Sequence, residues 1–404
     1  MSIQKKHVLY VSYTGLMEPL GRSQILSYLL RLSSDYNFTI VSFEKTENLN
    51  DLKSLHALQE ECAASGIEWI YKEYHSTPRL LATAWDLFVL VCSVVKLSLL
   101  RQSSIVHCRS YIPAFAVWLS TRFTRTPFLF DMRALWIDEM VTAGRLSETS
   151  LLFKVLKKCE RRILNDAAAS VSLTVKAVEY LSANYPEINL SNIAVIPTCV
   201  NLELFFPSER GNESIYKSTV VIGSVGSLSS GWFPLDWLFQ LYCASNAEKE
   251  TDLLIVTKDC VGVVEPLAEQ YKVDLNDITI HSVEPADVTS QIHNMTYGVV
   301  FNSASVGRLG SFPTRMAEFL ACGIPVIGNS GVGDVADIIR RYNVGVIVDD
   351  NSTESFKSAV DEMTELLKDS ELKARCLDAA RDYFSADVGA EKYEAIYRQI
   401  SNAY

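Results

Sequence analysis

Short apolar runs alternate with helical stretches in two successive series, and this alternation limits the fold more than any other feature of the 404-residue chain. Strands that alternate with helices are typical of a parallel sheet covered by helices. The first series predicts strands at Val8–Tyr13, Phe38–Phe43, Trp69–Tyr71, Ile105–Cys108, Phe128–Phe130, Ala169–Leu173 and Ile193–Pro197. The second predicts strands from Val220 and at Asp252–Thr257, Ile278–His281, Gly298–Asn302, Pro325–Gly328 and Val344–Val348. The fold class is therefore α/β, with two doubly wound, Rossmann-like sheets that bind ligand at the carboxyl ends of their strands.

The chain length and one proline-flanked segment indicate that the chain has two domains. A chain of 404 residues exceeds the usual range of one domain, so two domains are expected. Residues 196–214 have prolines at both flanks and a polar tail, which is typical of a linker. We therefore predict one domain over residues 1–200 and a second over 201–380. Residues 381–404 have apolar and aromatic side chains at helical spacing and predict a terminal helix.

Composition excludes several classes of protein. The net charge of −11 argues against a broad nucleic-acid surface, which needs clustered Lys and Arg. The nine cysteines form no Cys-x-x-Cys pair and none has zinc-like spacing with His, so we expect no metal and a reducing, cytoplasmic location. The amino-terminal sequence is unlike a signal peptide, because its apolar run is short and ends in polar residues.

Leu80–Leu100 is an apolar stretch almost long enough to span a membrane. Asp86 and Lys96 lie inside it, and a membrane span normally avoids such charges. The stretch therefore predicts a buried helix that covers a sheet. The alternative is a helix that lies in the membrane interface, at the inner face of the cell membrane.

The stretch Gly307–Asp334 reads as a loop, a short helix and a buried strand around an anion site. Ser311 and Pro313 are start signals, and a glycine ten residues later ends the helix, which gives about three turns. Thr314 and Arg315 fall in the first turn, where unpaired N–H groups and the helix dipole favour phosphate oxygens. Glu318 shares a face with Thr314, and a carboxylate one turn beyond a phosphate site can accept hydrogen bonds from a ribose diol. The pattern predicts a nucleoside diphosphate ligand.

This stretch resembles the donor-binding signature of retaining GT-B glycosyltransferases, in particular glycosyl transferase group 1 (family 4). In that signature a first glutamate faces the donor sugar and a second, eight positions later, faces the ribose. Glu318 matches the second, whereas Gly310 occupies the place of the first. The resemblance implies an N-terminal acceptor domain and a C-terminal donor domain that face each other across a cleft. It also implies that the terminal helix crosses back to the N-terminal domain.

The resemblance also assigns donor contacts outside this helix. Gly15 belongs to a loop that corresponds to the family's glycine-rich loop, and Val283 lies where the base is bound. Ser227 and Gly231 stand near the positions where the family commonly has an Arg and a Lys for the phosphates, so the positive charge must come from elsewhere. The donor site implied in this way comprises Gly15, Ser227, Lys258, Val283, Arg308, Gly310, Ser311, Thr314, Arg315 and Glu318.

Charged residues directly follow two strands of the first series, Ile105–Cys108 and Phe128–Phe130. Asp131 and Arg133 come after Phe128–Phe130, and charges at strand ends are expected to face the ligand. We assign both to acceptor positioning or the transfer step, with a structural ion pair of Arg133 with Asp131 or with Glu139 as the alternative. His107 is interpreted as a hydrogen-bonded strand-end residue rather than a base. The acceptor-binding candidates are Arg22, Arg109 and Glu139.

The function implied by the resemblance is transfer of a sugar from a nucleotide diphosphate-sugar to a hydroxyl of a glycan or lipid-linked acceptor. The product is expected to be a bacterial cell-surface glycan: capsule, O-antigen or exopolysaccharide. No nucleophile is evident, so we expect front-face displacement through an oxocarbenium-like transition state, without metal or cofactor. Two alternatives remain: a nucleotide-sugar epimerase of related fold, and a non-catalytic glycan-assembly partner that keeps the fold.

Overall fold

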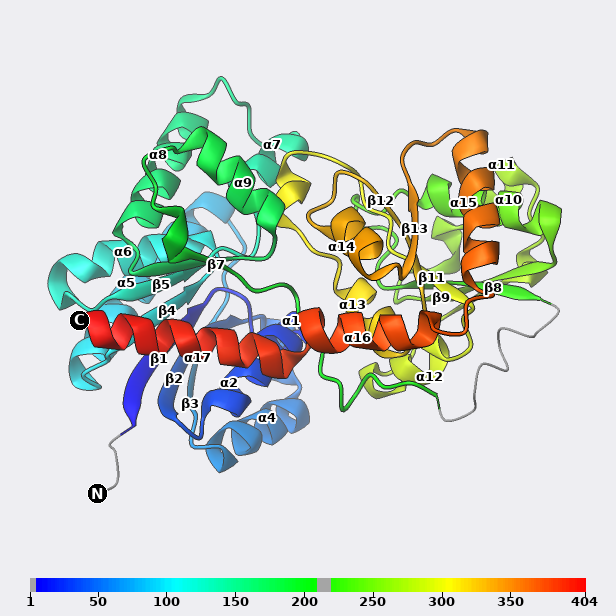
Figure 1. The fold of residues 1–404 in the computed structure, drawn as a ribbon. Coiled ribbons are helices and arrows are strands. Elements are labelled where there is room, and N and C mark those ends of the chain that lie inside the picture. The colour runs from blue at the N-terminus through cyan, green and yellow to red at the C-terminus, as the bar shows by residue number, and fades with distance from the viewer. Residues whose placement is uncertain (1–4, 209–218) are drawn as a thin grey trace. The chain divides into compact units, whose positions relative to one another are not determined.

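The computed structural model describes residues 5–208 and 219–404, and the chain folds into two compact α/β units (Figure 1). Unit 1 comprises Met1–Pro197 and Ala386–Tyr404, and unit 2 comprises Thr198–Ser385. The last residues of the expected linker, 209–214, lie outside the described residues. Each unit is built on a parallel sheet, so the predicted α/β class with two doubly wound sheets is confirmed.

The sheet of unit 1 has seven described strands in the order β3-β2-β1-β4-β5-β6-β7. The strands are β1 (Lys6–Ser12), β2 (Tyr36–Glu44), β3 (Glu68–Glu73), β4 (Ile105–Arg109), β5 (Phe128–Asp131), β6 (Ala169–Ser172) and β7 (Ile193–Val195). The pairings are parallel, and Val11 of β1 lies between Val41 of β2 and Cys108 of β4. Strand order reverses between β1 and β4, so the loops after these strands are the expected ligand-binding edge of the unit.

Helices cover both faces of this sheet. They are α1 (Pro19–Gly21), the π-helix Arg22–Leu26, α2 (Ser27–Leu32), α3 (Thr46–Asn50), α4 (Leu52–Ala64), α5 (Arg79–Leu100), α6 (Tyr111–Thr124), α7 (Trp136–Thr142), α8 (Leu151–Asp166), α9 (Val175–Asn184) and α17 (Ala386–Ala403). Right-handed crossovers place α5, α6 and α8 on one face and α2 and α4 on the other. The terminal helix α17 packs against α2, and its Tyr393 and Tyr397 stack edge-on against Tyr28 and Tyr36 (Figure 1).

The sheet of unit 2 has six described strands in the order β10-β9-β8-β11-β12-β13. They are β8 (Val220–Val225), β9 (Thr251–Val256), β10 (Ile278–His281), β11 (Tyr297–Val299), β12 (Val326–Asn329) and β13 (Gly345–Val348). Its helices are α10 (Leu235–Glu248), α11 (Glu265–Tyr271), α12 (Val288–Ile292), α13 (Thr314–Ala321), α14 (Val335–Tyr342), α15 (Thr353–Leu366) and α16 (Leu372–Phe384). Strand order reverses between β8 and β11, which makes the loops after these two strands the expected ligand-binding edge.

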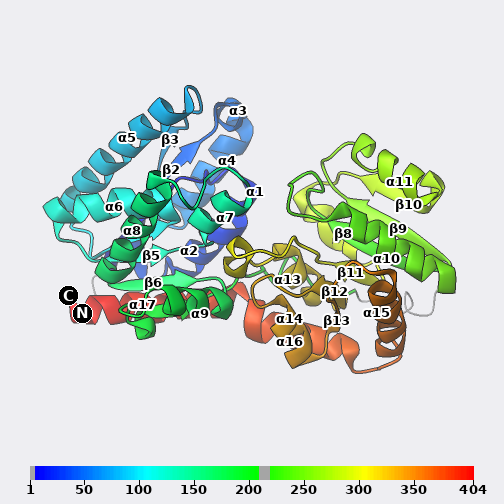
Figure 2. The ribbon, with the colours of Figure 1, turned by 90° about the horizontal axis from the view of Figure 1, so that it is seen from above.

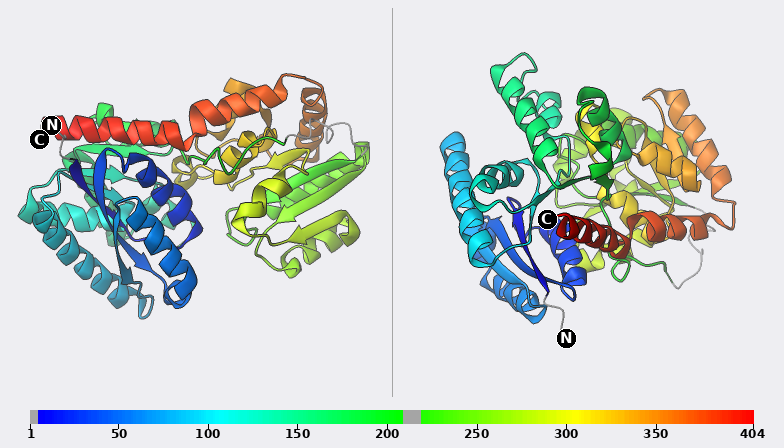
Figure 3. Two further views of the ribbon diagram at one scale, coloured as in Figure 1. Left: turned by 90° about the horizontal axis from the view of Figure 1, so that it is seen from below. Right: turned by 60° about the vertical axis from the view of Figure 1, so that its left-hand side comes forward.

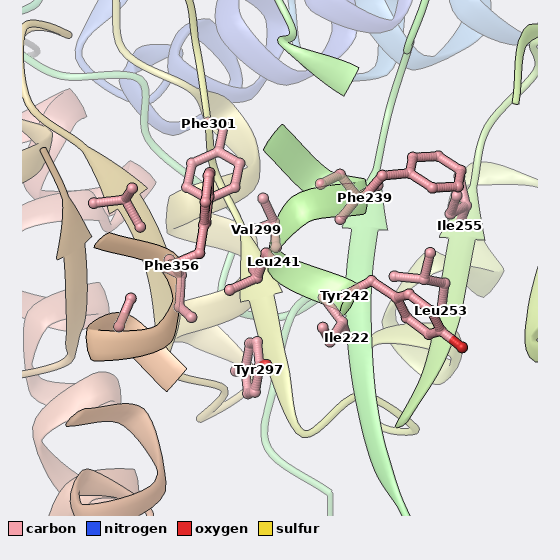
Figure 4. Close-up of a cluster of buried hydrophobic side chains, with 14 of the residues drawn as sticks. Ile222, Phe239, Leu241, Tyr242, Leu253, Ile255, Tyr297, Val299, Phe301 and Phe356 are labelled. Atoms are coloured by element: carbon pink, nitrogen blue, oxygen red, sulfur yellow. The ribbon is translucent and has the colours of Figure 1, made fainter. Parts of the chain in front are cut away.

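The core of unit 2 fixes the position of the candidate site. Figure 4 shows Ile222, Val299 and Phe301 of the sheet region packed against Phe239 and Phe356 of the covering helices. These side chains are buried, so the strands that carry the site loops are held rigidly.

Helix α13 approaches the opposite face of the sheet closely at Gly298. A Cβ atom there would lie only 2.4 Å from the ring of Phe319. The glycine therefore lets the helix lie directly on β11.

The apolar stretch Leu80–Leu100 forms α5, but the prediction of a buried helix is only partly right. The helix covers the sheet beside α6, as Figure 2 shows, yet only one of its faces is buried. Asp86 lies on this inner face and is fully buried. Its carboxylate is tolerated there because it accepts hydrogen bonds from the hydroxyl of Tyr13 and from the backbone N–H of His75. Among the described residues, α5 is the one helix long and apolar enough to cross a membrane.

Candidate functional site

Helix α13 provides the amino terminus that the sequence predicts, but the helix is shorter than expected. It spans eight residues, about two turns, because Pro313 is the N-cap rather than a residue of the first turn. At the other end Gly323 has φ +77°, and the backbone N–H of Ile324 donates to the carbonyl of Phe319. The N-cap Pro313 makes no side-chain hydrogen bond, so within the described residues it leaves the first-turn N–H groups of Thr314 and Arg315 uncapped.

Arg315 points from this first turn toward the loop that follows β8. A Cβ atom at Gly226, whose φ is +103°, would lie 3.2 Å from Nη2 of Arg315, and the guanidinium carbon lies 5.4 Å from the centre of the Phe233 ring. Its Nη1 is buried and makes no hydrogen bond within residues 5–208 and 219–404. A buried guanidinium donor without an acceptor suits an anionic ligand at the edge where strand order reverses.

Glu318 lies one turn further along the same helix and is half-buried. Burial raises the pKa of Glu318 to about 7, and the positive charge of Arg315 offsets this only in part. A carboxylate with a strongly raised pKa beside a cation, at the ligand-binding edge of a sheet, is typical of a functional site.

Arg308 has a different setting from Arg315. It belongs to a 3₁₀ turn, Gly307–Gly310, that also places Gly310 in a buried position. The guanidinium of Arg308 lies 3.6 Å from the ring centre of Trp232, and its Nη1 donates to Oγ of Ser311 at 3.2 Å. Stacking on an aromatic face holds the guanidinium plane in one orientation, which suits recognition of a phosphate.

The hydroxyl of Ser227 already has a hydrogen-bond partner within the protein. Its hydroxyl donates to Oδ2 of Asp259 at 3.0 Å, and the hydroxyl of Ser229 donates to Oδ1 at 2.7 Å. The backbone N–H groups of Leu228 and Ser229 donate to the same carboxylate. Burial alone would raise the pKa of Asp259, but these hydrogen bonds lower it to about 2. The Ser227 loop is therefore a turn wrapped around a carboxylate, and Ser227 enters a phosphate contact only if it leaves Asp259.

Lys258 and Val283 follow β9 and β10 at the same edge of the sheet. Lys258 is exposed to solvent, unlike Arg308 and Arg315. Val283 is half-buried in the loop between β10 and the 3₁₀ turn Pro285–Asp287. Sequence reasoning did not single out Asn302 and Asn329, which follow β11 and end β12.

These two asparagines form a paired bridge at the ligand-binding edge. The backbone N–H of Asn302 donates to Oδ1 of Asn329, whose Nδ2 donates back to the Asn302 carbonyl, both at 2.9 Å. Oδ1 of Asn302 is buried without a hydrogen-bond partner in the described part of the chain. Asn302 ends the predicted strand Gly298–Asn302 and Asn329 directly follows Pro325–Gly328, so a polar residue at the end of an apolar run was the available signal for both positions.

In unit 1, Asp131 is fully buried at the end of β5. Its Oδ2 accepts a hydrogen bond from the hydroxyl of Tyr393 in α17 at 3.0 Å. The same oxygen lies 3.6 Å from both His107 Nε2 and Arg109 Nη1, and Oδ1 lies 3.8 Å from Arg133 Nη1. The structure thus brings Asp131, Arg109 and Arg133 together, in the arrangement that a structural ion pair requires.

Electrostatics in this cluster follow from burial and from the two guanidinium groups. Burial would raise the pKa of Asp131, but Arg133, His107 and Arg109 together lower it from its ordinary value of 3.8. Burial lowers the pKa of His107, whose Nδ1 lies 2.7 Å from the hydroxyl of Tyr397. The structure thus places His107 as a buried, hydrogen-bonded residue at a strand end, which agrees with the sequence interpretation. Arg109 and Arg133 also donate to Gln24, which connects the cluster to the π-helix Arg22–Leu26.

Two other candidates in unit 1, Gly15 and Arg22, contact neighbouring protein residues. A Cβ atom at Gly15 would lie 2.2 Å from Oε2 of Glu44, and this buried carboxylate accepts the backbone N–H of Leu16 at 2.6 Å. Gly15 is thus required by loop packing. Arg22 is half-exposed and pairs with Glu61 at 2.7 Å.

Glu139 is half-buried in the first turn of α7. Its neighbour Asp138, which the sequence did not indicate, forms a buried network. Lys157 Nζ lies 2.6 Å from Asp138 and 2.9 Å from Glu160. The hydroxyl of Tyr180 donates to Asp138 at 2.9 Å, so this network joins α7, α8 and α9.

No group of three or more His, Cys, Asp or Glu side chains suited to a metal ion occurs among the described residues. The polar groups that gather after β8 and β11 are cations, hydroxyls and amides. Their chemistry suits a phosphate-bearing ligand.

Comparison with known proteins gives a family match in unit 2. Residues 261–383 match the family model described as glycosyl transferases group 1, and this range contains α13, Arg308, Arg315 and Glu318. A search of curated protein sequences gives no significant match.

Solved structures similar to this chain share the GT-B fold across almost its whole length. A glycosyltransferase from Rickettsia africae has a TM-score of 0.71 and 19% identity, covering 98% of this chain and 99% of that chain. HepE from Anabaena in complex with UDP-glucose has a TM-score of 0.69 and 14% identity, covering 98% of both chains. WaaG, a glycosyltransferase involved in lipopolysaccharide biosynthesis, has a TM-score of 0.67 and 15% identity, covering 96% of this chain and 99% of that chain.

Proposed function

We propose that this chain, a GT-B glycosyltransferase of group 1, transfers a sugar from a nucleoside diphosphate-sugar to a hydroxyl group with retention of configuration. One observation carries the choice of donor. The amino terminus of α13 combines Nη1 of Arg315, which is buried without a hydrogen bond among the described residues, with the Glu318 carboxylate one turn later. Cation and amides suit a diphosphate, and the carboxylate suits a ribose diol. The likeness to HepE, which was solved with UDP-glucose, supports the same class of donor.

In this proposal the diphosphate binds at the first turn of α13 and beside the guanidinium of Arg315. Arg308, held against Trp232, contributes a second cation at the same edge of the sheet. The ribose hydroxyls donate to Glu318. Gly310 leaves room where related enzymes place a carboxylate near the donor sugar, so that contact passes to backbone groups of the turn Gly307–Gly310.

The transfer step follows from this binding. As the bond between the anomeric carbon and the diphosphate oxygen breaks, negative charge develops on the departing diphosphate and positive charge on the sugar ring. The α13 amides and Arg315 stabilise the departing diphosphate, and fixed donors of this kind are usually the largest catalytic contribution. The acceptor hydroxyl attacks from the same face and passes its proton to the leaving phosphate oxygen. This gives retention without a protein nucleophile.

The acceptor in this proposal is a glycan or a lipid-linked saccharide of a cell-surface polysaccharide, and the reaction takes place in the cytoplasm. The likeness to WaaG, which is involved in lipopolysaccharide biosynthesis, supports this class of pathway.

A panel of nucleotide sugars, incubated with the protein with and without lipid-linked saccharide acceptors, tests the proposal. Chromatography of the nucleotide products should detect nucleoside diphosphate release that depends on acceptor. Conversion of the donor sugar without acceptor would identify an epimerase instead. Nucleotide binding without turnover across the panel would support a non-catalytic partner and contradict the proposal.

A further inference from the structure

An exposed apolar stripe runs along α5 of unit 1. Leu81, Trp85, Phe88 and Leu99 have exposed fractions of 71%, 56%, 59% and 58%, and Cys92 between them is also exposed. Successive members of this row are four, three, four and seven residues apart, which places them on one side of the helix. Figure 3 shows this helix in light blue along the outside of unit 1, at the left of the right-hand view. Large exposed apolar side chains in one row mark an interaction surface.

The opposite side of α5 is fixed to the protein. Oδ1 of the fully buried Asp86 lies 2.6 Å from His75 Nδ1, and its Oδ2 accepts the Tyr13 hydroxyl at 2.8 Å. A helix that crossed a bilayer would have to give up these contacts and expose a carboxylate to hydrocarbon. The geometry therefore fits a helix that lies along a surface.

Neighbouring helices in the same layer extend the apolar surface. Helix α6 packs between α5 and α8, and Figure 2 shows the three helices on one side of unit 1. At the start of α8, Leu151 and Leu152 have exposed fractions of 78% and 58%, and Phe123 at the end of α6 is also exposed. The surface is thus wider than one helix.

The exposed charges of this layer have one predominant sign. On the described side chains of α5, α6 and α8, the exposed charged groups are one aspartate, Asp166, and six cations: Lys96, Arg122, Lys154, Lys158, Arg161 and Arg162. The whole chain has a net charge of −11, so this concentration of cations is local. Apolar side chains interspersed with Lys and Arg, including a tryptophan, are typical of a surface that binds anionic lipid headgroups.

We propose that the outer surface of α5, α6 and α8 binds an anionic phospholipid bilayer, with the stripe Leu81, Trp85, Phe88, Cys92 and Leu99 immersed in the headgroup region. This binding concerns where the protein acts and does not depend on the transfer reaction. It is measured without donor or acceptor, so its failure leaves the proposed transferase activity untouched.

Flotation with vesicles tests the proposal on the full chain. The wild type should float with phosphatidylcholine vesicles that contain phosphatidylglycerol, and less with phosphatidylcholine alone. The double variant Trp85→Ser/Phe88→Ser should bind about tenfold more weakly or worse. Lys154→Gln/Lys158→Gln should lose the preference for anionic vesicles. The matched control Val261→Ser/Leu275→Ser changes two residues of unit 2 with exposed fractions of 45% and 47% and should bind like the wild type.

A fluorophore on Cys92 tests directly whether the stripe on α5 contacts the lipid. Cys92 and Cys260 are the exposed cysteines of the described chain and Cys159 and Cys243 are half-buried, so an environment-sensitive label on Cys92 in a background with Ser at the other three positions reports the stripe alone. Its emission should shift to the blue on anionic vesicles, whereas a label on Cys260 in a background with Ser in place of Cys92, Cys159 and Cys243 should not respond. No flotation of the wild type, or equal binding by the stripe and control variants, would overturn the proposal. So would a dimer in light scattering that the Trp85→Ser/Phe88→Ser change abolishes, because the stripe would then be an interface with a second copy.

Discussion

Arg315 and Glu318 carry opposite charges on one short helix, and burial disfavours the charged form of both side chains. Nη1 of Arg315 is buried without an acceptor in the described residues, and burial raises the pKa of Glu318 to about 7. Both residues could be identified from the sequence. They follow the helix start signals Ser311 and Pro313, and their spacing of three residues places them on one face of the helix. Asp259 could not, because its partners in the Ser227 loop lie 30 to 32 residues away.

Replacing Arg315 with Met keeps an unbranched side chain and removes the charged donor. We expect affinity for uridine or guanosine diphosphate to fall by about 1.5–3 kcal/mol, the range for hydrogen bonds to charged groups, with nucleoside affinity unchanged. Calorimetric titration measures both. Lys272→Met is the matched control, because Lys272 is an exposed lysine of unit 2 at the end of α11, outside the candidate donor site. An equal loss in the control would show that general charge, rather than the Arg315 contact, holds the diphosphate.

Replacing Glu318 with Gln should stabilise the ligand-free protein at high pH. The folded pKa of about 7 lies above the ordinary value of 4.5, so stability is fully present below pH 4.5 and is lost as pH rises through 7. The variant should therefore unfold like the wild type at pH 5 and be more stable by about 1–3 kcal/mol at pH 8.5. Urea denaturation at the two pH values measures this. An equal effect at both would mean that the carboxylate is not held in a charge-disfavouring site.

At the scale of elements, the strands and α13 were predictable, whereas the polar contacts that fasten the elements together were not. Each strand is a short apolar run with turn signals beside it, and such a pattern is local. The cluster around Asp131 combines residues of β4, β5 and α17 with Gln24 after β1, so no spacing in the sequence reveals it. The same holds for the network of Lys157, Asp138 and Glu160 across α7 and α8.

Asp131→Asn tests whether that cluster is structural. The change leaves the buried guanidinium groups of Arg109 and Arg133 without their counter-charge, so we expect the free energy of unfolding to fall by about 3–5 kcal/mol. Tyr393→Phe is the milder control, because it removes a single hydrogen bond to Asp131 and should cost about 1 kcal/mol. If Asp131→Asn instead unfolds like the wild type and slows transfer by about 10²–10⁴-fold, Asp131 acts in the transfer step.

For the whole molecule, sequence patterning gave the fold class and a resemblance to glycosyl transferases group 1, but left the buried and the interfacial interpretations of α5 open. Hydropathy alone cannot separate a buried helix from an interfacial one, because both require an apolar run. The structure shows that Trp85 and Phe88 on one face of α5 are exposed and that Asp86 on the opposite face is buried against His75. The proposed transferase activity depends on a different region, the edge of unit 2 where α13 begins.

Titration of uridine and guanosine diphosphates into the wild type and Glu318→Gln at pH 8.5 tests this donor site most directly. Gln keeps the size of the side chain and removes the charge that strengthens hydrogen bonds from the ribose diol. One of the two diphosphates should bind the wild type, and its affinity should fall by about 1.5–3 kcal/mol in the variant. Equal affinity in a folded variant, or no binding of either diphosphate to the wild type, would contradict it.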